Sequence, residues 1–218
     1  MKLKTVILVF LILCIFQASV VSGHANGHYT TNHRNHFNDI RSNDNAFPKF
    51  NNVLPVNNTN DNSFTVVNPH IGNSYYYGEP TNQKIKLINN NNAKDPTYAK
   101  LVAFIKADQT DKKLYSSQYM CDMFAQDVHN NAEKAGIKAA WVALVLVNPD
   151  DEQFCTAFHT TDKGLVYIDC TGEDHKITTS CDTIVNVKVG VKYHPLSLYP
   201  PFDRDYTQGT IKKFDIFW

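Results

Sequence analysis

Residues 141–147, WVALVLV, form an apolar run that no polar side chain interrupts. A run of this length and composition is typical of a β-strand that is buried on both faces. Other elements must pack against such a strand, so the sequence on either side of the run indicates the fold.

Two helices are predicted before the run. Asp95 is suited to cap a helix that has Pro96 at its first position, and the apolar spacing predicts that this helix ends near Ala107. A second helix is predicted from a cap at Ser117 to a stop at Gly136. Its apolar stripe contains Cys121, Ala125, Val128, Ala132 and Ala135. Cys121 should therefore lie in the first turns of the packed face.

Antiparallel strands are predicted after the run. FCTAFHTT (154–161) and LVYIDC (165–170) flank Asp162-Lys163-Gly164, which suits a type I turn closed by a glycine bulge. The segment 182–191 alternates as a strand does, and 210–218 is expected to close the sheet. This order predicts an α+β fold in which the helix with Cys121 packs against an antiparallel sheet.

The first 23 residues have the pattern of a secretory signal peptide. Lys2 and Lys4 precede the apolar run 5–16, and a small-residue cleavage pattern ends at Gly23. The apolar run is too short to span a bilayer comfortably. We therefore expect a secreted or cell-surface protein without stable membrane insertion after signal cleavage, and an uncleaved anchor is the alternative.

Residues 24–94 differ in composition from the rest of the chain. Asn is over-used, ending in a run at 89–92, and apolar residues are scattered apart from 63–67 and 84–88. This composition predicts an Asn-rich, largely disordered linker with room for one or two strands. Residues 95–218 are then the folded domain.

Charge and composition indicate neither a nucleic-acid partner nor a cofactor. The formal net charge is zero, so nucleic acid is not an expected partner. Four histidines near the N-terminus lack a spacing that defines a metal site, and no metal or organic cofactor is implied. These are His24, His28, His33 and His36. Export would permit disulfides, and the pairings Cys170–Cys181 and Cys155–Cys181 are both open.

Cys121 is a candidate nucleophile because of its place at a predicted helix start. The N-terminal N–H groups and the helix dipole favour a thiolate, and the same N–H groups can bind an oxyanion. A base must lie beside the sulfur, with a third group to orient that base. If Thr161 lies opposite Leu165 in the hairpin, His159 is a diagonal neighbour of Asp169, at roughly 7 Å. A loop one residue longer would turn His159 to the other face.

The segment YMCDMFAQDVHNNAEKAGIKAAWVALVL resembles the core helix and first strand of transglutaminase-like proteins, which share a papain-related thiol fold. Cys121 matches the family's nucleophile, and Asp169 matches the closing Asp of the hairpin GLVYIDCTG. The chain is also similar to uncharacterised exported prokaryotic proteins with the same HNNAE-x-AGI-x-AAWV and TTD-x-GLVYIDCTG segments. The resemblance covers about residues 95 to 218. In one respect this chain departs from the family, because Gln153 occupies the position of the catalytic His.

The resemblance implies thiol-dependent acyl transfer at an amide, by hydrolysis or transamidation, on a protein or peptide substrate. Cys121 would attack the carbonyl, His159 would move the proton, and Asp169 would orient the histidine. The alternative is a binding or structural domain that kept the fold but lost the base, since Gln cannot act as a general base near neutral pH.

Overall fold

A computed structural model describes residues 63–78, 81–149, 151–174, 179–199 and 207–218. The predicted signal peptide lies outside these residues, as does the part of the predicted linker before residue 63. The helical elements are α2 (Tyr98–Ala107), the 3-10 turn η2 (Thr110–Lys112) and α3 (Cys121–Lys134). The long strands are β7 (Ala140–Val147), β8 (Asp151–Thr160), β9 (Gly164–Asp169) and β12 (Thr210–Phe217), and the shorter ones are β1 (Phe64–Val67), β2 (His70–Ile71), β3 (Ser74–Tyr75), β4 (Tyr77–Gly78), β5 (Gln83–Lys84), β6 (Leu87–Asn90), β10 (Thr183–Val185) and β11 (Leu196–Ser197).

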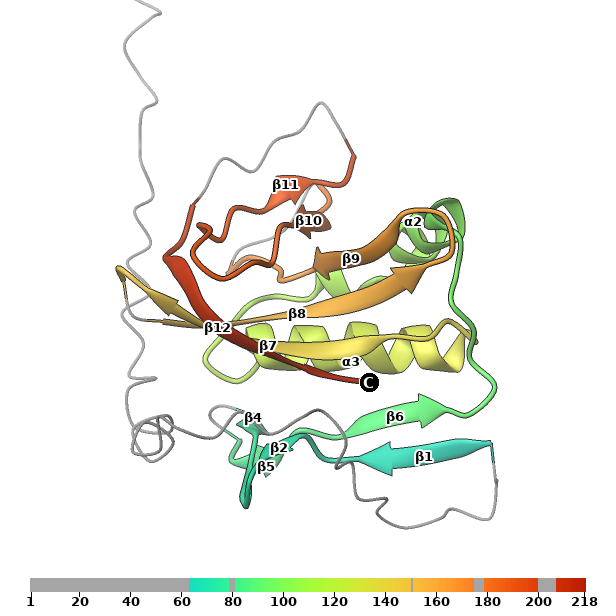
Figure 1. The fold of residues 1–218 in the computed structure, drawn as a ribbon, viewed down its shortest axis with the longest axis horizontal. Coiled ribbons are helices and arrows are strands. Elements are labelled where there is room, and N and C mark those ends of the chain that lie inside the picture. The colour runs from blue at the N-terminus through green and yellow to red at the C-terminus, as the bar shows by residue number, and fades with distance from the viewer. Residues whose placement is uncertain (1–62, 79–80, 150, 175–178, 200–206) are drawn as a thin grey trace, which may run out of the picture. The chain divides into compact units, whose positions relative to one another are not determined.

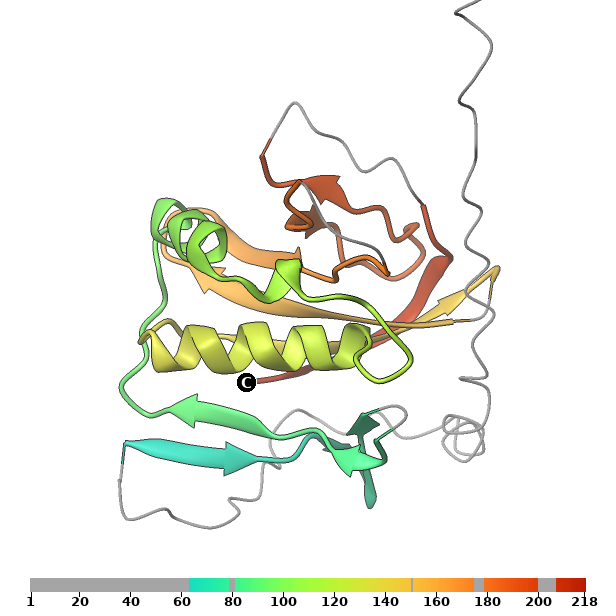
Figure 2. The same ribbon diagram turned by 180° about the vertical axis from the view of Figure 1, so that it is seen from behind.

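A six-stranded antiparallel sheet is the centre of the fold, with strand order β11-β10-β9-β8-β7-β12. The apolar run forms β7, which pairs with β8 on one side and β12 on the other. The helices α2 and α3 lie against one face of this sheet (Figure 2). The prediction of an α+β fold, with the Cys121 helix packed on an antiparallel sheet, is confirmed.

The helix α3 begins later than its predicted cap at Ser117. The backbone of Ser116 and Tyr119 exchanges two hydrogen bonds of 3.1 Å, which form a tight turn just before the helix. Cys121 is consequently the first helical residue, and Met120 is the N-cap. Four residues of the predicted stripe are buried, whereas Ala135 is exposed at the C-terminal end.

The N-cap of α2 is Thr97, not Asp95. The Thr97 hydroxyl accepts a hydrogen bond of 3.2 Å from the Lys100 backbone N–H. Asp95 instead accepts a hydrogen bond from the side chain of His159 at 2.9 Å. The helix ends at Ala107, as predicted.

The hairpin between β8 and β9 has a different register from the one predicted. Thr160 lies opposite Gly164, so the loop is Thr161-Asp162-Lys163 rather than Asp162-Lys163-Gly164. The Thr160 hydroxyl stabilises this turn, since it donates to the Gly164 carbonyl at 2.8 Å and accepts from the Lys163 N–H at 3.1 Å. Gly164 has a φ of 72°, which favours glycine. The shift is one residue on each strand, so every side chain keeps its predicted face.

The two C-terminal strands differ in how well the sequence predicted them. β12 spans almost all of 210–218 and forms an edge of the sheet, as expected. The strand predicted over 182–191 covers only Thr183–Val185. The chain turns soon afterwards at Gly190, which has a φ of 83°.

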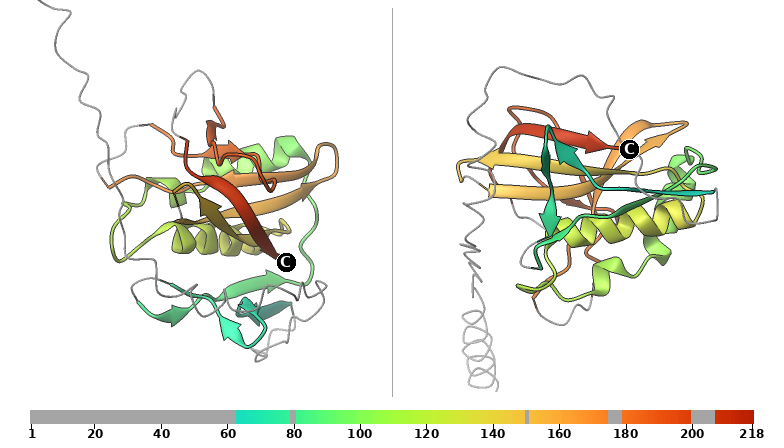
Figure 3. Two further views of the ribbon diagram at one scale, coloured as in Figure 1. Left: turned by 60° about the vertical axis from the view of Figure 1, so that its left-hand side comes forward. Right: turned by 90° about the horizontal axis from the view of Figure 1, so that it is seen from below.

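The described residues between 63 and 94 form several short strands, where a largely disordered linker with room for one or two strands was predicted. β1 and β6 pair with each other, and β6 packs beside α3 (Figures 1 and 3). Val67, Tyr76, Ile85 and Leu87 are buried in the same core cluster as Cys121. The ordered structure therefore begins well before residue 95.

Polar side chains on α3 bind the backbone of β6 and of residues just before β6 and just before β7. The Asn130 amide accepts from the Ile88 N–H at 2.8 Å and donates to the Lys86 carbonyl at 3.0 Å. Glu133 Oε2 accepts from the Asn90 N–H at 2.8 Å, and Glu133 Oε1 accepts from the Ala139 N–H at 2.7 Å. These side chains satisfy backbone groups that would otherwise require a neighbouring strand.

Candidate active site

Cys121 opens α3 and lies in an apolar part of the core. Its side chain is only 5% exposed and belongs to a cluster that includes Ala125, Trp141 and Phe154. The indole N–H of Trp141 donates to the Asp122 carbonyl at 3.2 Å, which ties β7 to this end of the helix. The side chain that β8 contributes to this cluster is the aromatic ring of Phe154, which cannot act as a base.

Burial dominates the chemistry of the Cys121 thiol. Desolvation raises the pKa of Cys121 well above its usual range, and the negative charges of Asp122, Asp169 and Asp151 raise it further. The Asp122 backbone N–H at the helix start acts in the opposite direction but has the smallest effect. The thiol is therefore protonated at neutral pH, contrary to the activation expected from the helix start.

Asp169 is buried at the end of β9, with all its partners in place. Its Oδ1 accepts from the Thr171 N–H at 2.8 Å. Its Oδ2 accepts from the Gln153 amide at 3.1 Å and from the Tyr193 hydroxyl at 2.7 Å. The carboxylate charge is thus held by three donors, and its position is defined by two strands and a distant loop.

Cys121 and Asp169 lie on opposite faces of the sheet. Phe154 packs with Cys121 on the helix face, so its neighbour Gln153 points to the other face by strand alternation. Gln153 also lies opposite Leu144, which belongs to the core cluster on the far face together with Tyr193. The hydrogen bonds of Asp169 to Gln153 and Tyr193 place its carboxylate on that same far face.

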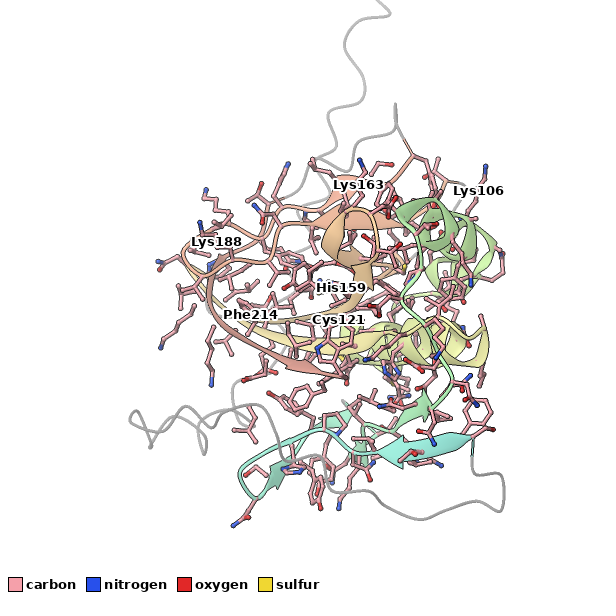
Figure 4. All side chains as sticks on the ribbon, turned by 45° about the vertical axis from the view of Figure 1, so that its right-hand side comes forward. Lys106, Cys121, His159, Lys163, Lys188 and Phe214 are labelled. Atoms are coloured by element: carbon pink, nitrogen blue, oxygen red, sulfur yellow. The ribbon has the colours of Figure 1, made fainter. Side chains whose placement is uncertain are left out.

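His159 lies away from both expected partners. Its side chain is 56% exposed, and its Nδ1 donates to Asp95 Oδ2 at 2.9 Å. In the observed register, Cys155 is the residue of β8 that lies level with Asp169. His159 is four residues further along β8, which corresponds to about 13 Å along the strand. The expected diagonal contact between His159 and Asp169 is therefore wrong, because the hairpin loop begins one residue earlier than predicted. Figure 4 labels Cys121 on α3 and His159 on β8.

Gln153 occupies the place beside Asp169 in which the resemblance expects a histidine. The sequence identified this position from its spacing before Asp169. Tyr193, the second donor to Asp169 Oδ2, was not identified, because it comes from an irregular segment 24 residues downstream with no motif. Together these residues form a buried polar network on the far face, and the sheet lies between this network and the sulfur on the helix face.

The four cysteines of the described residues are buried in the core, and none of them is part of a disulfide. Neither Cys170–Cys181 nor Cys155–Cys181 forms a disulfide. Within the same residues, no cluster of three or more His, Cys, Asp or Glu side chains could hold a metal ion. The helices described here include none with the length and apolar character needed to cross a membrane.

The chain matches no protein-family model, no curated protein sequence and no solved structure.

Proposed function

We propose that this protein is a transglutaminase-like domain that has lost thiol catalysis and serves as a binding or structural domain. One observation carries the proposal: the sheet separates the Cys121 sulfur from Gln153 and Asp169. Acyl transfer by a thiol needs the base within hydrogen-bond reach of the sulfur and the orienting group beyond it. Of the described residues that could serve as these groups, Gln153 and Asp169 lie on the far face of the sheet and His159 lies at the turn end of β8, whereas the buried, protonated thiol packs beside Phe154.

Two further features support the same proposal. Gln153 can donate a hydrogen bond to Asp169 but cannot take a proton from a thiol near neutral pH. His159 is exposed and bound to Asp95, at the far end of β8. A domain of this kind would contact a protein or peptide partner through its surface rather than process it.

The reactivity of Cys121 tests this proposal. The folded protein is treated with iodoacetamide at pH 6, and alkylation of each cysteine is followed by peptide mass mapping. Cys155, which is also buried, serves as the internal control. We expect both thiols to react at the same slow rate, limited by opening of the fold, and to react freely in urea. Alkylation of Cys121 much faster than Cys155 in the folded protein would contradict the proposal and favour an active nucleophile.

We also propose that the protein is exported, on the basis of the basic start and apolar run in residues 1–23. Mass spectrometry of the protein recovered from the producing organism tests this. A mature chain that begins near His24 and is found outside the cytoplasm is expected. A chain that keeps Met1 and stays inside the cell contradicts it.

A further inference from the structure

Two buried carboxylates lie against a single serine hydroxyl. Asp111 belongs to η2 and is 2% exposed, and Asp182 precedes β10 and is 3% exposed. The Ser180 hydroxyl oxygen lies 3.0 Å from Asp111 Oδ2 and 2.9 Å from Asp182 Oδ2. It also accepts a hydrogen bond of 3.1 Å from the Asp182 N–H. Both carboxylates are therefore within hydrogen-bond distance of one hydroxyl group.

The number of protons at this contact determines whether it is stable. A serine hydroxyl has one proton, so it can donate to only one of the two carboxylates. If both are ionised, the other contact joins two oxygens without a proton between them, in a buried environment. A single added proton removes the conflict, since Asp182 can then donate to Ser180 while Ser180 donates to Asp111.

The surrounding groups favour a negative charge on Asp111 rather than on Asp182. The Lys112 ammonium donates to Asp111 Oδ2 at 2.9 Å and to the Thr179 carbonyl at 3.2 Å. The Cys181 N–H donates to the same Asp111 oxygen at 3.0 Å. The Cys170 thiol and the Tyr199 hydroxyl also face Asp182 and lower its pKa, but neither carries a charge, and burial together with the charge of Asp111 outweighs them. The added proton therefore belongs on Asp182.

We propose that Asp111, Ser180 and Asp182 form a pH-sensitive latch that fastens the segment entering β10 to η2. With Asp182 protonated, the chain Asp182–Ser180–Asp111 has a proton in each contact and the latch is closed. With Asp182 ionised, the two carboxylates repel each other and the latch weakens. The latch joins segments that are about 70 residues apart in the sequence.

The direction in which the pKa of Asp182 is shifted agrees with this geometry. Burial, followed by the charge of Asp111, raises the pKa of Asp182 from 3.8 to about 6. A carboxyl group whose pKa is raised by folding stabilises the fold below its unfolded pKa. That contribution is lost as the pH rises through the folded pKa. The latch is therefore closed at about pH 4 and weakened above about pH 6.

Direct titration of the wild-type protein is the first test. Carbon-13 NMR of the Asp182 side chain, assigned with Asp182→Asn, is expected to show a midpoint near pH 6. The Cys181 backbone N–H donates a hydrogen bond to Asp111. Hydrogen exchange at this amide should therefore accelerate more steeply across the same pH range than the intrinsic base-catalysed exchange rate does. A midpoint below pH 4.5 would overturn the proposal, as would exchange that follows the intrinsic rate throughout.

Stability measurements supply the second test. Asn at position 182 is neutral and can donate to Ser180, so Asp182→Asn should resemble the protonated form at every pH. We expect wild type and variant to have similar urea midpoints at pH 4. At pH 7.5 the folding equilibrium constant of the variant should be roughly ten- to a hundredfold higher. Parallel pH profiles of the two proteins would contradict the latch.

Two further variants complete the comparison. Asp162→Asn removes an exposed carboxylate from the β8–β9 hairpin, where the Asn side-chain oxygen can still accept from the Tyr98 N–H, and should leave the pH profile of the wild type unchanged. Ser180→Ala removes the shared hydroxyl, so its destabilisation should be larger at pH 4, where the latch is closed, than at pH 7.5. An equal loss of stability at both pH values would argue against the proposed protonation of the contact.

Discussion

Cys121 and Asp169 lie on opposite faces of one antiparallel sheet, although the sequence resemblance predicted that they belong to one catalytic site. The Cys121 sulfur packs with apolar side chains under α3, while the Asp169 carboxylate is bound by Gln153 and Tyr193 on the far face. Both residues therefore contribute to the packing of the fold, but their positions do not bring them together for a catalytic reaction.

A histidine introduced beside Asp169 should not create an active thiol. In Gln153→His the new imidazole would hydrogen-bond to Asp169 on the far face and remain separated from Cys121 by the sheet. We expect no acyl-enzyme on Cys121 after incubation with an activated ester, as measured by intact mass. The double variant Gln153→His, Cys121→Ser is the control for acylation elsewhere. Acylation that requires both the introduced imidazole and the Cys121 thiol would show that the two side chains can meet.

Asp169 should contribute strongly to stability because it is the acceptor for three donors. In Asp169→Asn an amide N–H₂ would face donor groups, and the charge that strengthens these hydrogen bonds would be lost. We expect a loss of roughly 2 to 4 kcal/mol in the free energy of unfolding, measured with urea. Tyr193→Phe removes one donor and should cost only about 1 kcal/mol. If both variants lost only a small and equal amount of unfolding free energy, the hydrogen bonds to Asp169 would contribute little to the stability of the fold.

The attachment of β6 to α3 should depend on Asn130. Its amide pairs with the backbone of Lys86 and Ile88, and Asn130→Ala leaves an N–H and a carbonyl without these partners. We predict a loss of about 2 kcal/mol in unfolding free energy. Hydrogen exchange at the Ile88 amide should also become faster. Lys134→Ala, at an exposed position of the same helix, is the control and should change stability by less than about 0.5 kcal/mol. Unchanged protection of Ile88 in Asn130→Ala would contradict the role given to the amide.

Acid should destabilise the protein through His129. This side chain is fully buried on α3, and desolvation lowers the pKa of His129 from 6.5 to about 4. A histidine with a lowered folded pKa binds fewer protons in the folded chain. It therefore opposes unfolding above its unfolded pKa and loses this contribution as the pH falls from 6.5 to 4.

The size of this effect can be isolated by substitution. The shift of the His129 pKa corresponds to about 3 kcal/mol between pH 7 and pH 4. Its sign is opposite to that of Asp182. We expect His129→Gln, whose side-chain amide can still donate to Asn130 Oδ1, to lose less stability than the wild type between these pH values. Urea unfolding at half-unit pH steps measures the difference. A steeper acid loss in His129→Gln than in the wild type would refute the assignment.

The sequence alone determined the elements whose hydrophobic pattern is local. The apolar run 141–147 became β7, the hairpin and β12 formed where predicted, and α3 buries its predicted stripe apart from Ala135. The face of each hairpin residue was also predictable, because strand alternation survived a register shift of one residue on each strand.

Tertiary structure decided the rest, because the deciding contacts join residues far apart in the sequence. Residues 63–94 look like a polar linker, but side chains of α3 satisfy their backbone from about 40 residues downstream. The surroundings of the thiol were likewise not readable from its helix-start position, since burial outweighs the effect of the helix N–H groups on its pKa. The sequence motif shows which residue types are present. Packing determines which face of the sheet each side chain occupies and whether its proton can be transferred to a base.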